Sequence, residues 1–209
     1  MKQLVILDLD DTIYSERDYF SGVFSSYEQA NELDSGSLLR AFDSINRKES
    51  RDILREALTM ASSYTPQNHD LLFLLYSTAE FAINLPQSSS RFLEILKSNQ
   101  IRTAVLTNGV VDVQKNKVRN LGLEAHVDKV FYARENSEKY EKPDIRCFQN
   151  VLEFFDCKPE NALMIGDSYN NDYLGGRNAQ IASLWLHGNN SESIQVLEEA
   201  IPFIFGTEQ

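Results

Sequence analysis

Short apolar runs alternate with amphipathic helical segments along most of the chain. Five runs have the pattern of buried strands, at residues 4–9, 103–106, 129–133, 162–165 and 182–186. Helix-period segments lie before or between the later four, at residues 91–97, 111–121 and 145–155, and Gly122 stands where a glycine commonly ends a helix. The alternation predicts an α/β fold, with a Rossmann-like parallel sheet of about five strands and helices on both faces.

Residues 15–85 depart from this alternation. Apolar residues recur there at helical spacing in four stretches, and no segment reads convincingly as a strand. The four stripes are Phe20, Val23, Phe24 and Tyr27; Leu38, Leu39, Phe42 and Ile45; Ile53, Leu54, Ala57, Leu58 and Ala61; and Leu71, Leu72, Leu75, Ala79 and Ala82. We therefore expect residues 15–85 to form an inserted all-helical domain. Residues 1–14 and 86–209 would build the sheet domain.

The charge balance excludes one large class of partners. The 209 residues include 20 Lys and Arg against 31 Asp and Glu, which gives a formal net charge of −11. Nucleic-acid polymers bind to basic surfaces that neutralise phosphates, so we expect no such partner. A small anionic substrate stays possible if a few basic groups are placed locally.

Several features favour a cytoplasmic protein. Cys147 and Cys157 would lie about 15 Å apart along one helix, too far for a disulfide, so we expect two reduced packing thiols. Too few apolar residues precede Asp8 for a signal peptide. No apolar stretch is long enough to span a bilayer. We expect a monomer or homodimer without a membrane partner.

The first apolar run ends in three acids, Asp8, Asp10 and Asp11. Open α/β sheets bind their ligands at the carboxyl ends of the strands, where these acids would lie. Two carboxylates about 4 Å apart repel by roughly 4 kcal/mol at an intermediate dielectric. A divalent cation, a lysine or a shared proton must offset that repulsion. The segment therefore suggests a hard metal ion with oxygen ligands.

Three further polar segments follow later strands. Thr107-Asn108-Gly109 could offer a hydroxyl and main-chain N–H groups to an anion. Lys142-Pro143 precedes a predicted helix, and Gly166-Asp167-Ser168 is followed by Asn171 and Asp172. Each segment alone is commonly a turn, a helix cap or a solvated charge. Their conjunction at one sheet edge favours a site.

These residues match a family pattern. Asp8-x-Asp10-x-Thr12, Thr107, Lys142-Pro143 and Gly166-Asp167-Ser168-x-x-Asn171-Asp172 resemble, in order and spacing, the four motifs of haloacid dehalogenase-like (HAD) hydrolases. The resemblance covers about residues 1–14 and 86–188. The helical segment between them resembles the cap of the first subclass by position only. One departure is Gln180, where the family usually has a glycine.

The resemblance implies a Mg²⁺-dependent phosphatase that works through a phospho-aspartate. Asp8 would be the nucleophile and Asp10 the acid/base. Asp8, Asp167 and the main-chain carbonyl of Asp10 would bind Mg²⁺. Thr107, Asn108 and Lys142 would bind the phosphate, and Lys142 would also orient Asp8. Asp172 and Asn171 would support these groups.

Asp10 separates activities within the family, because dehalogenases need no proton for a leaving alcohol and lack this acid. A phosphosugar mutase shares every motif and stays an alternative. A receiver-like phosphoacceptor domain is another alternative, although such domains carry their aspartate after a middle strand and have no large insertion after the first. A binding module without catalysis is disfavoured because every motif keeps its reactive group.

The resemblance implies that the cap and the segment after the first motif select the substrate. Tyr14, Arg17, Tyr19 and Phe20 follow Thr12 closely enough to be candidates. For each of them, a hinge or core contact is the alternative. The overall resemblance suggests nucleoside monophosphates, phosphosugars or phosphoglycolate, with a lean towards nucleoside monophosphates.

Overall fold

The computed structural model describes residues 1–47, 49–135 and 140–206. The chain forms two compact units. The core unit comprises Met1–Ser15 and Asn84–Gln209, and the helical unit comprises Glu16–Ile83. Each is described by itself.

The core unit is built on a parallel sheet with strand order β3-β2-β1-β4-β5-β6. The strands are β1 (Leu4–Leu7), β2 (Arg102–Thr107), β3 (Lys129–Tyr132), β4 (Ala162–Gly166), β5 (Ala182–Leu186) and β6 (Ser193–Ile194). All five predicted strands are confirmed. The sixth has only two residues, too few to show a period in the sequence.

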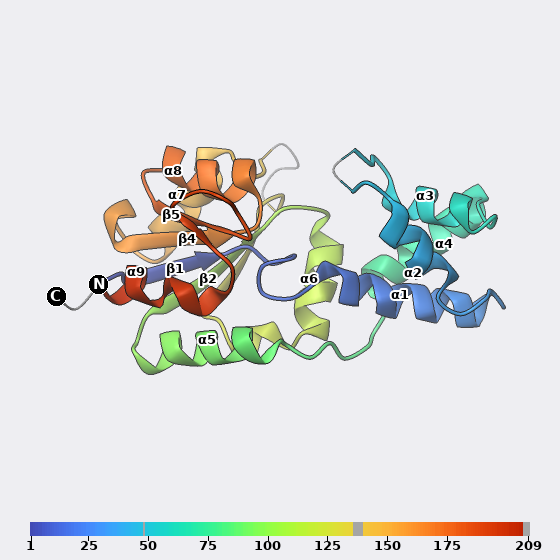
Figure 1. Ribbon diagram of the computed structural model, residues 1–209, viewed down its shortest axis with the longest axis horizontal. Helices are drawn as coiled ribbons and strands as arrows, with labels where there is room; N and C mark the ends of the chain where they lie inside the picture. The colour runs from blue at the N-terminus through green and yellow to red at the C-terminus, as the bar shows by residue number, and fades with distance from the viewer. Residues whose placement is uncertain (48, 136–139, 207–209) are drawn as a thin grey trace. The chain divides into compact units, whose positions relative to one another are not determined.

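Helices cover both faces of this sheet, which confirms the α/β prediction. Helices α7 and α8 lie on one side, and α5 and α9 lie on the other (Figure 1). The α-helices of this unit are α5 (Gln87–Ser98), α6 (Val111–Asn120), α7 (Ile145–Phe154), α8 (Gly175–Asn178) and α9 (Ile201–Phe205). Short turns η1 (Leu123–Ala125), η2 (Pro159–Asn161), η3 (Tyr169–Leu174) and η4 (Leu197–Ala200) connect them to the strands.

Two turns have the left-handed backbone that the sequence suggested. Gly122 follows α6 with φ of 58°, as expected for a glycine that ends a helix. Gln180 follows α8 with φ of 64°, in a region where a glycine is unstrained. The departure from the family pattern at this position therefore concerns turn geometry.

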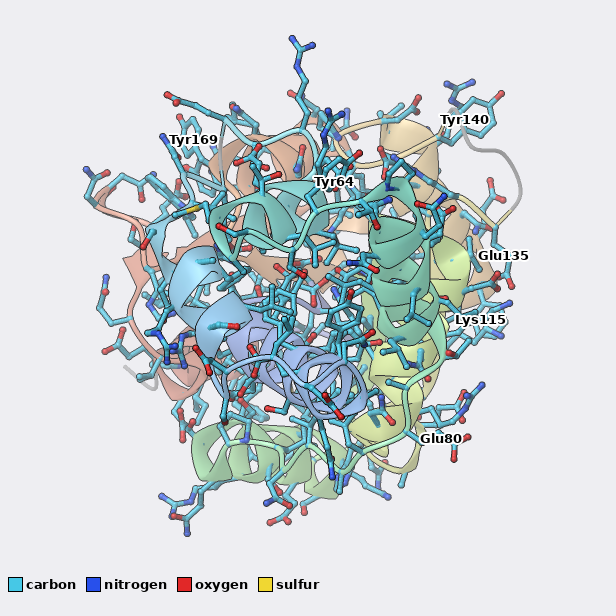
Figure 2. All side chains as sticks on the ribbon, turned by 90° about the vertical axis from the view of Figure 1, so that its right-hand side faces the viewer. Tyr64, Glu80, Lys115, Glu135, Tyr140 and Tyr169 are labelled. Carbon is cyan, nitrogen blue, oxygen red and sulfur yellow. The ribbon has the colours of Figure 1, made fainter. Side chains whose placement is uncertain are left out.

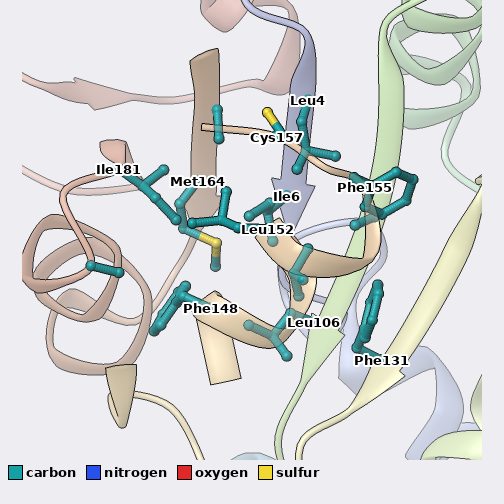
Figure 3. Close-up of a cluster of buried hydrophobic side chains, with 14 of the residues drawn as sticks. Leu4, Ile6, Leu106, Phe131, Phe148, Leu152, Phe155, Cys157, Met164 and Ile181 are labelled. Carbon is teal, nitrogen blue, oxygen red and sulfur yellow. The ribbon is translucent and has the colours of Figure 1, made fainter. Parts of the chain in front are cut away.

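One core cluster packs α7 against the sheet (Figure 3). Leu4 and Ile6 of β1 point to this face because side chains alternate along a strand, and Phe148 of α7 is a fully buried member of the same cluster. Cys147 and Cys157 belong to the same cluster as free, buried thiols. Burial raises the pKa of the Cys147 thiol to about 11. Both cysteines are packing groups, as expected.

The topology brings the polar segments to one edge. Strand β1 lies between β2 and β4, and the chain winds outward from it in both directions. Such a reversal of strand order opens a crevice at the carboxyl ends of the strands. The residues just after β1, β2 and β4 are therefore neighbours in space.

The helical unit contains α1 (Glu16–Ala30), α2 (Ser37–Ser44), α3 (Ile53–Met60) and α4 (Pro66–Thr78), and its described residues include no strand. The rings of Phe20 and Phe42 pack in its core at a tilt of 34°, with centroids 4.5 Å apart. The fourth predicted stripe is too long, because α4 ends at Thr78 and the backbone is extended at Ala79. Ala82 therefore lies beyond the helix.

Among the described residues, no helix combines the length and the apolarity that crossing a bilayer requires.

The core cluster yields a stability prediction. Phe148→Ala should lower the free energy of unfolding by about 3–5 kcal/mol, because it leaves a cavity under a fully buried ring. Phe154→Ala on the same helix removes a ring that is 59% exposed and should cost about 1 kcal/mol or less. Urea denaturation of both variants measures the difference. Equal losses would contradict the packing described here.

Candidate active site

Strand pairing sets the position of Asp8. Its main-chain N–H donates to the carbonyl of Ile165 over 3.0 Å, which continues the β1–β4 pairing by one residue. Leu7 also pairs with Val105 in β2. The Asp8 carboxyl therefore lies at the sheet edge where β2 and β4 also end.

Lys142 joins two of the predicted acids. Its Nζ lies 2.5 Å from Asp8 Oδ1 and 2.7 Å from Asp172 Oδ1, and all three residues are buried. Burial alone would lower the pKa of Lys142, but the charges of Asp172 and Asp8 outweigh it and the pKa is raised. Lys142 is therefore a fixed positive charge beside Asp8.

The position of Asp172 depends on a close approach at the end of β4. A Cβ on Gly166 would lie 2.3 Å from Asp172 Oδ2, so no larger residue fits there. The other support is a hydrogen bond of 3.0 Å from the main-chain N–H of Ser168 to the same oxygen. Asn171 contributes its main-chain N–H, which donates to Ser168 Oγ over 3.3 Å. The glycine of the fourth motif thus makes room for its last acid.

Asp167 is held by its main chain. Its N–H donates to Thr12 Oγ1 over 3.2 Å, which ties the first motif to the fourth. Trp185 of β5 donates from Nε1 to the carbonyl of Asp167 over 2.8 Å. The sequence did not reveal this contact of Trp185. Burial, with the nearby charges of Asp172 and Asp11, raises the pKa of Asp167 to about 6.

These acids fit a divalent cation. Carboxylate oxygens of Asp8, Asp167 and Asp172 lie within 4.8 Å of one another. Burial raises the pKa of Asp8, with Asp172 adding to the rise against the opposing effect of Lys142. Burial and neighbouring negative charges disfavour the ionised form of such carboxyls, and a bound cation would favour it. Oxygen ligands of this kind suit Mg²⁺.

The carboxylate of Asp10 is bound by three other side chains. The hydroxyl of Tyr14 donates to Oδ1 over 2.7 Å, Gln114 Nε2 donates to Oδ2 over 2.8 Å, and Lys117 Nζ lies 2.9 Å from both oxygens. Burial alone would raise the pKa of Asp10, but the Lys117 charge and these hydrogen bonds lower it. The Asp10 carboxylate is therefore bound by its own set of side chains and does not belong to the group formed by Asp8, Asp167 and Asp172.

Gln114 and Lys117 were not predicted from the sequence. Both are buried and lie on α6, between Val113 and Val118. A helical wheel would have shown the signal, because both polar residues fall on the apolar face of the helix.

Thr107 and Asn108 lie at the end of β2. Gln114 Nε2 is 2.7 Å from Thr107 Oγ1, and Thr107 is buried. The side-chain amide of Asn108 pairs with the main chain of Lys142, donating to its carbonyl over 2.9 Å and accepting from its N–H over 2.8 Å. Asn108 therefore holds the Lys142 segment with its side chain. A phosphate contact from this residue would use its main chain.

The four substrate-selection candidates divide between the two units. Tyr14 contacts Asp10 within the core unit. Arg17 is about half exposed and pairs with Asp43 through two hydrogen bonds of 2.7 Å within the helical unit. Tyr19 and Phe20 are buried there, and Tyr19 donates to the main-chain carbonyl of Tyr76. Tyr19 and Phe20 thus make core contacts, the alternative to substrate selection that the sequence left open.

Comparison with known proteins identifies the family. A model of haloacid dehalogenase-like hydrolases matches residues 2–180. The chain is 26% identical to the glyceraldehyde 3-phosphate phosphatase of Methanothermobacter thermautotrophicus, over 92% of this chain and 89% of that one. It is 31% identical to the phosphoserine phosphatase of Thermus thermophilus, over 64% of this chain and about half (53%) of that one.

A solved structure supports the fold over the whole length. The putative HAD-hydrolase YfnB from Bacillus subtilis, bound to magnesium, superposes with a TM-score of 0.75 at 20% identity, over 98% of this chain and 99% of that one. The prediction of a phosphoric monoester hydrolase agrees with both curated relatives. The match to the family model, together with the four motifs at one sheet edge, shows that the chain belongs to the haloacid dehalogenase-like hydrolase family.

Proposed function

We propose that this hydrolase is a Mg²⁺-dependent phosphomonoesterase that acts on a small phosphorylated metabolite through a phosphorylated Asp8. The observation that carries the proposal is the bridge from Lys142 to Asp8 and Asp172 at the end of β1. A buried carboxylate fixed by a lysine, with a second acid two residues further on, suits nucleophilic displacement at phosphorus. The phosphatase names of the curated relatives agree with it.

The reaction balances in two displacements. In the first, an Asp8 oxygen forms a bond to phosphorus, the bond from phosphorus to the ester oxygen breaks, and Asp10 gives a proton to the leaving oxygen. In the second, water attacks phosphorus, Asp10 takes a proton from it, and the Asp8–phosphorus bond breaks. The proton taken in the second step serves the first step of the next turnover.

Lys142 and Thr107 bind the phosphoryl group in this scheme. Lys142 supplies a positive charge next to Asp8. The Thr107 hydroxyl, which donates to the Asn108 carbonyl over 3.2 Å, would turn to a phosphate oxygen, and the main chain after it would add N–H donors. Preorganised donors stabilise charge that develops on the transferring group. Asp172 keeps Lys142 in place through the contact of 2.7 Å.

Asp8 and Asp167, with the main-chain carbonyl of Asp10, would hold Mg²⁺. The grouped carboxylates and their elevated pKa values support a cation here. When bound, the ion neutralises negative charge between the nucleophile and the phosphate.

The leaving group is less sharply defined than the reaction. Both curated relatives named above act on small phosphate esters by their names, and the sequence leans towards nucleoside monophosphates. Phosphate release from a panel of nucleotides and sugar phosphates would rank the substrates. Isomerisation of a hexose phosphate without release of phosphate would instead identify the mutase alternative.

Removal of the nucleophile tests the proposal first. Asp8→Asn should lower the release of phosphate from p-nitrophenyl phosphate by at least about 10³-fold, since the amide cannot attack phosphorus. Asp156→Asn is the matched control, because Asp156 is exposed in the turn after α7 with φ of 45°, which asparagine tolerates. Full activity of Asp8→Asn would refute the mechanism.

Removal of the metal tests the cofactor. Treatment with a chelator should abolish turnover, and added Mg²⁺ should restore it, because the grouped carboxylates otherwise repel the phosphate dianion. Isothermal titration of Mg²⁺ into the chelator-treated protein and into Asp167→Asn gives a readout independent of activity. An enzyme indifferent to the chelator would contradict the cofactor assignment.

Asp10 can be tested through the leaving group. Asp10→Asn should slow phenyl phosphate more than p-nitrophenyl phosphate, because the more basic phenolate needs a proton to depart. The expected difference is about tenfold or more, measured as the ratio of the two kcat values. Equal losses on both esters would exclude Asp10 as the proton donor.

A further inference from the structure

Lys117 is an almost fully buried lysine that the proposed mechanism does not use. Its exposed fraction is 2%, and its Nζ lies 2.9 Å from both oxygens of Asp10. A buried ammonium group is costly unless it is paired and hydrogen-bonded. The contact with Asp10 of the first motif therefore stabilises the buried charge of Lys117 on α6.

The contacts around Asp10 restrict how its carboxylate can turn. A carboxylate offers about four acceptor positions. Tyr14, Gln114 and Lys117 make four contacts with the two oxygens, two on each. To exchange a proton with a leaving group, Asp10 must lose at least one of these donors.

Gln114 is the donor that can move away. Its Nε2 lies 2.8 Å from Asp10 Oδ2, 2.7 Å from Thr107 Oγ1 and 2.6 Å from the main-chain carbonyl of Asn108. The amide has only two N–H groups for these three acceptors. When the amide donates to Thr107 and Asn108, Asp10 Oδ2 is released without leaving a buried N–H unsatisfied.

Gln114 also connects Asp10 to the phosphate-binding side. Thr107 is the last residue of β2, next to Asn108, and is a phosphate ligand in the proposed function. Because Gln114 Nε2 lies 2.7 Å from Thr107 Oγ1, a change in the hydrogen bonds of Thr107 alters those of Gln114 directly. Asp10 and the phosphate site are thus linked by one side chain.

We propose that Lys117 and Gln114 are positioning residues for the acid/base group: Lys117 anchors the carboxylate of Asp10, and Gln114 releases its Oδ2 when Thr107 engages the phosphate. This inference rests on the proposed function. The proton then passes from Asp10 Oδ2 to the leaving oxygen as that oxygen separates from phosphorus, and it returns from water in the second displacement. Neither Lys117 nor Gln114 gains or loses a proton.

The experiment compares two variants and a control on two esters. Lys117→Met and Gln114→Met keep side-chain length but remove the donors. The control is Lys115→Met on the same helix, where Lys115 is exposed and pairs with Glu135 over 2.9 Å (Figure 2). The probes are phenyl phosphate and p-nitrophenyl phosphate, and urea denaturation reports whether each variant is folded.

Lys117→Met should lower kcat on phenyl phosphate at least about tenfold more than on p-nitrophenyl phosphate. Gln114→Met should show the same selectivity, because Asp10 Oδ2 is no longer held in position before its release, and should also raise KM, because Gln114 contacts Thr107. The control should change both values by less than about twofold. If Lys117→Met does not fold, Gln114→Met alone decides the question.

A double-mutant cycle separates positioning from a general structural role. In an Asp10→Asn background, Lys117→Met and Gln114→Met should add no further selectivity between the esters, since the group they position is already lost. A selective loss that persists in that background, or equal losses on both esters, would overturn the inference.

The two proposals fail in different ways. If Asp10→Asn itself shows no selectivity between the esters, the acid/base role of Asp10 and this inference are both wrong. If Asp10→Asn is selective and the folded Lys117 and Gln114 variants are not, the proposed function stands and only the positioning role falls.

Discussion

The crowding of carboxylates at the end of β1 is the constraint on which this site depends. Asp8 and Asp10 are two residues apart, and Asp167 and Asp172 approach from the end of β4. Such a group is stable only if positive charge is placed among it. Two buried lysines supply it, with Lys142 on Asp8 and Asp172 and Lys117 on Asp10. Each acid of the first motif therefore has its own lysine.

Different segments of the chain supply these two lysines. Lys117 comes from α6, which follows β2, and Lys142 comes from the segment between β3 and α7. Three local contacts hold the site segments in place. Thr12 Oγ1 accepts a hydrogen bond from the Asp167 N–H, the Asn108 amide pairs with the Lys142 main chain, and Gly166 leaves room for Asp172. The first two of these contacts each join two of the four motifs, and the third lies within the fourth motif. The motifs are thus structural partners as well as chemical ones.

Much of this arrangement could be predicted from the sequence because strands, helices and motif acids have local signals. The strands of residues 4–9 and 162–165 were visible as apolar runs, and Asp8, Lys142 and Asp172 as a spaced pattern. The contacts of Trp185 with the Asp167 carbonyl and of Lys117 with Asp10 have no local signal of that kind. They depend on pairings between positions 18 and 107 residues apart, which only the folded chain defines.

The same constraint explains why the two neighbouring acids can take different roles. The Lys117 charge and three hydrogen-bonding side chains lower the pKa of Asp10, whereas burial and the charge of Asp172 raise the pKa of Asp8 despite Lys142. These opposite shifts follow from the two sets of partners, with grouped acids beside Asp8 and hydrogen-bond donors around Asp10. A nucleophilic Asp8 reacts as the anion, and Lys142 supplies one positive charge beside it. The grouped oxygens of Asp8, Asp167 and Asp172 are where a divalent cation would add further positive charge, whereas the Asp10 carboxylate is bound by Lys117.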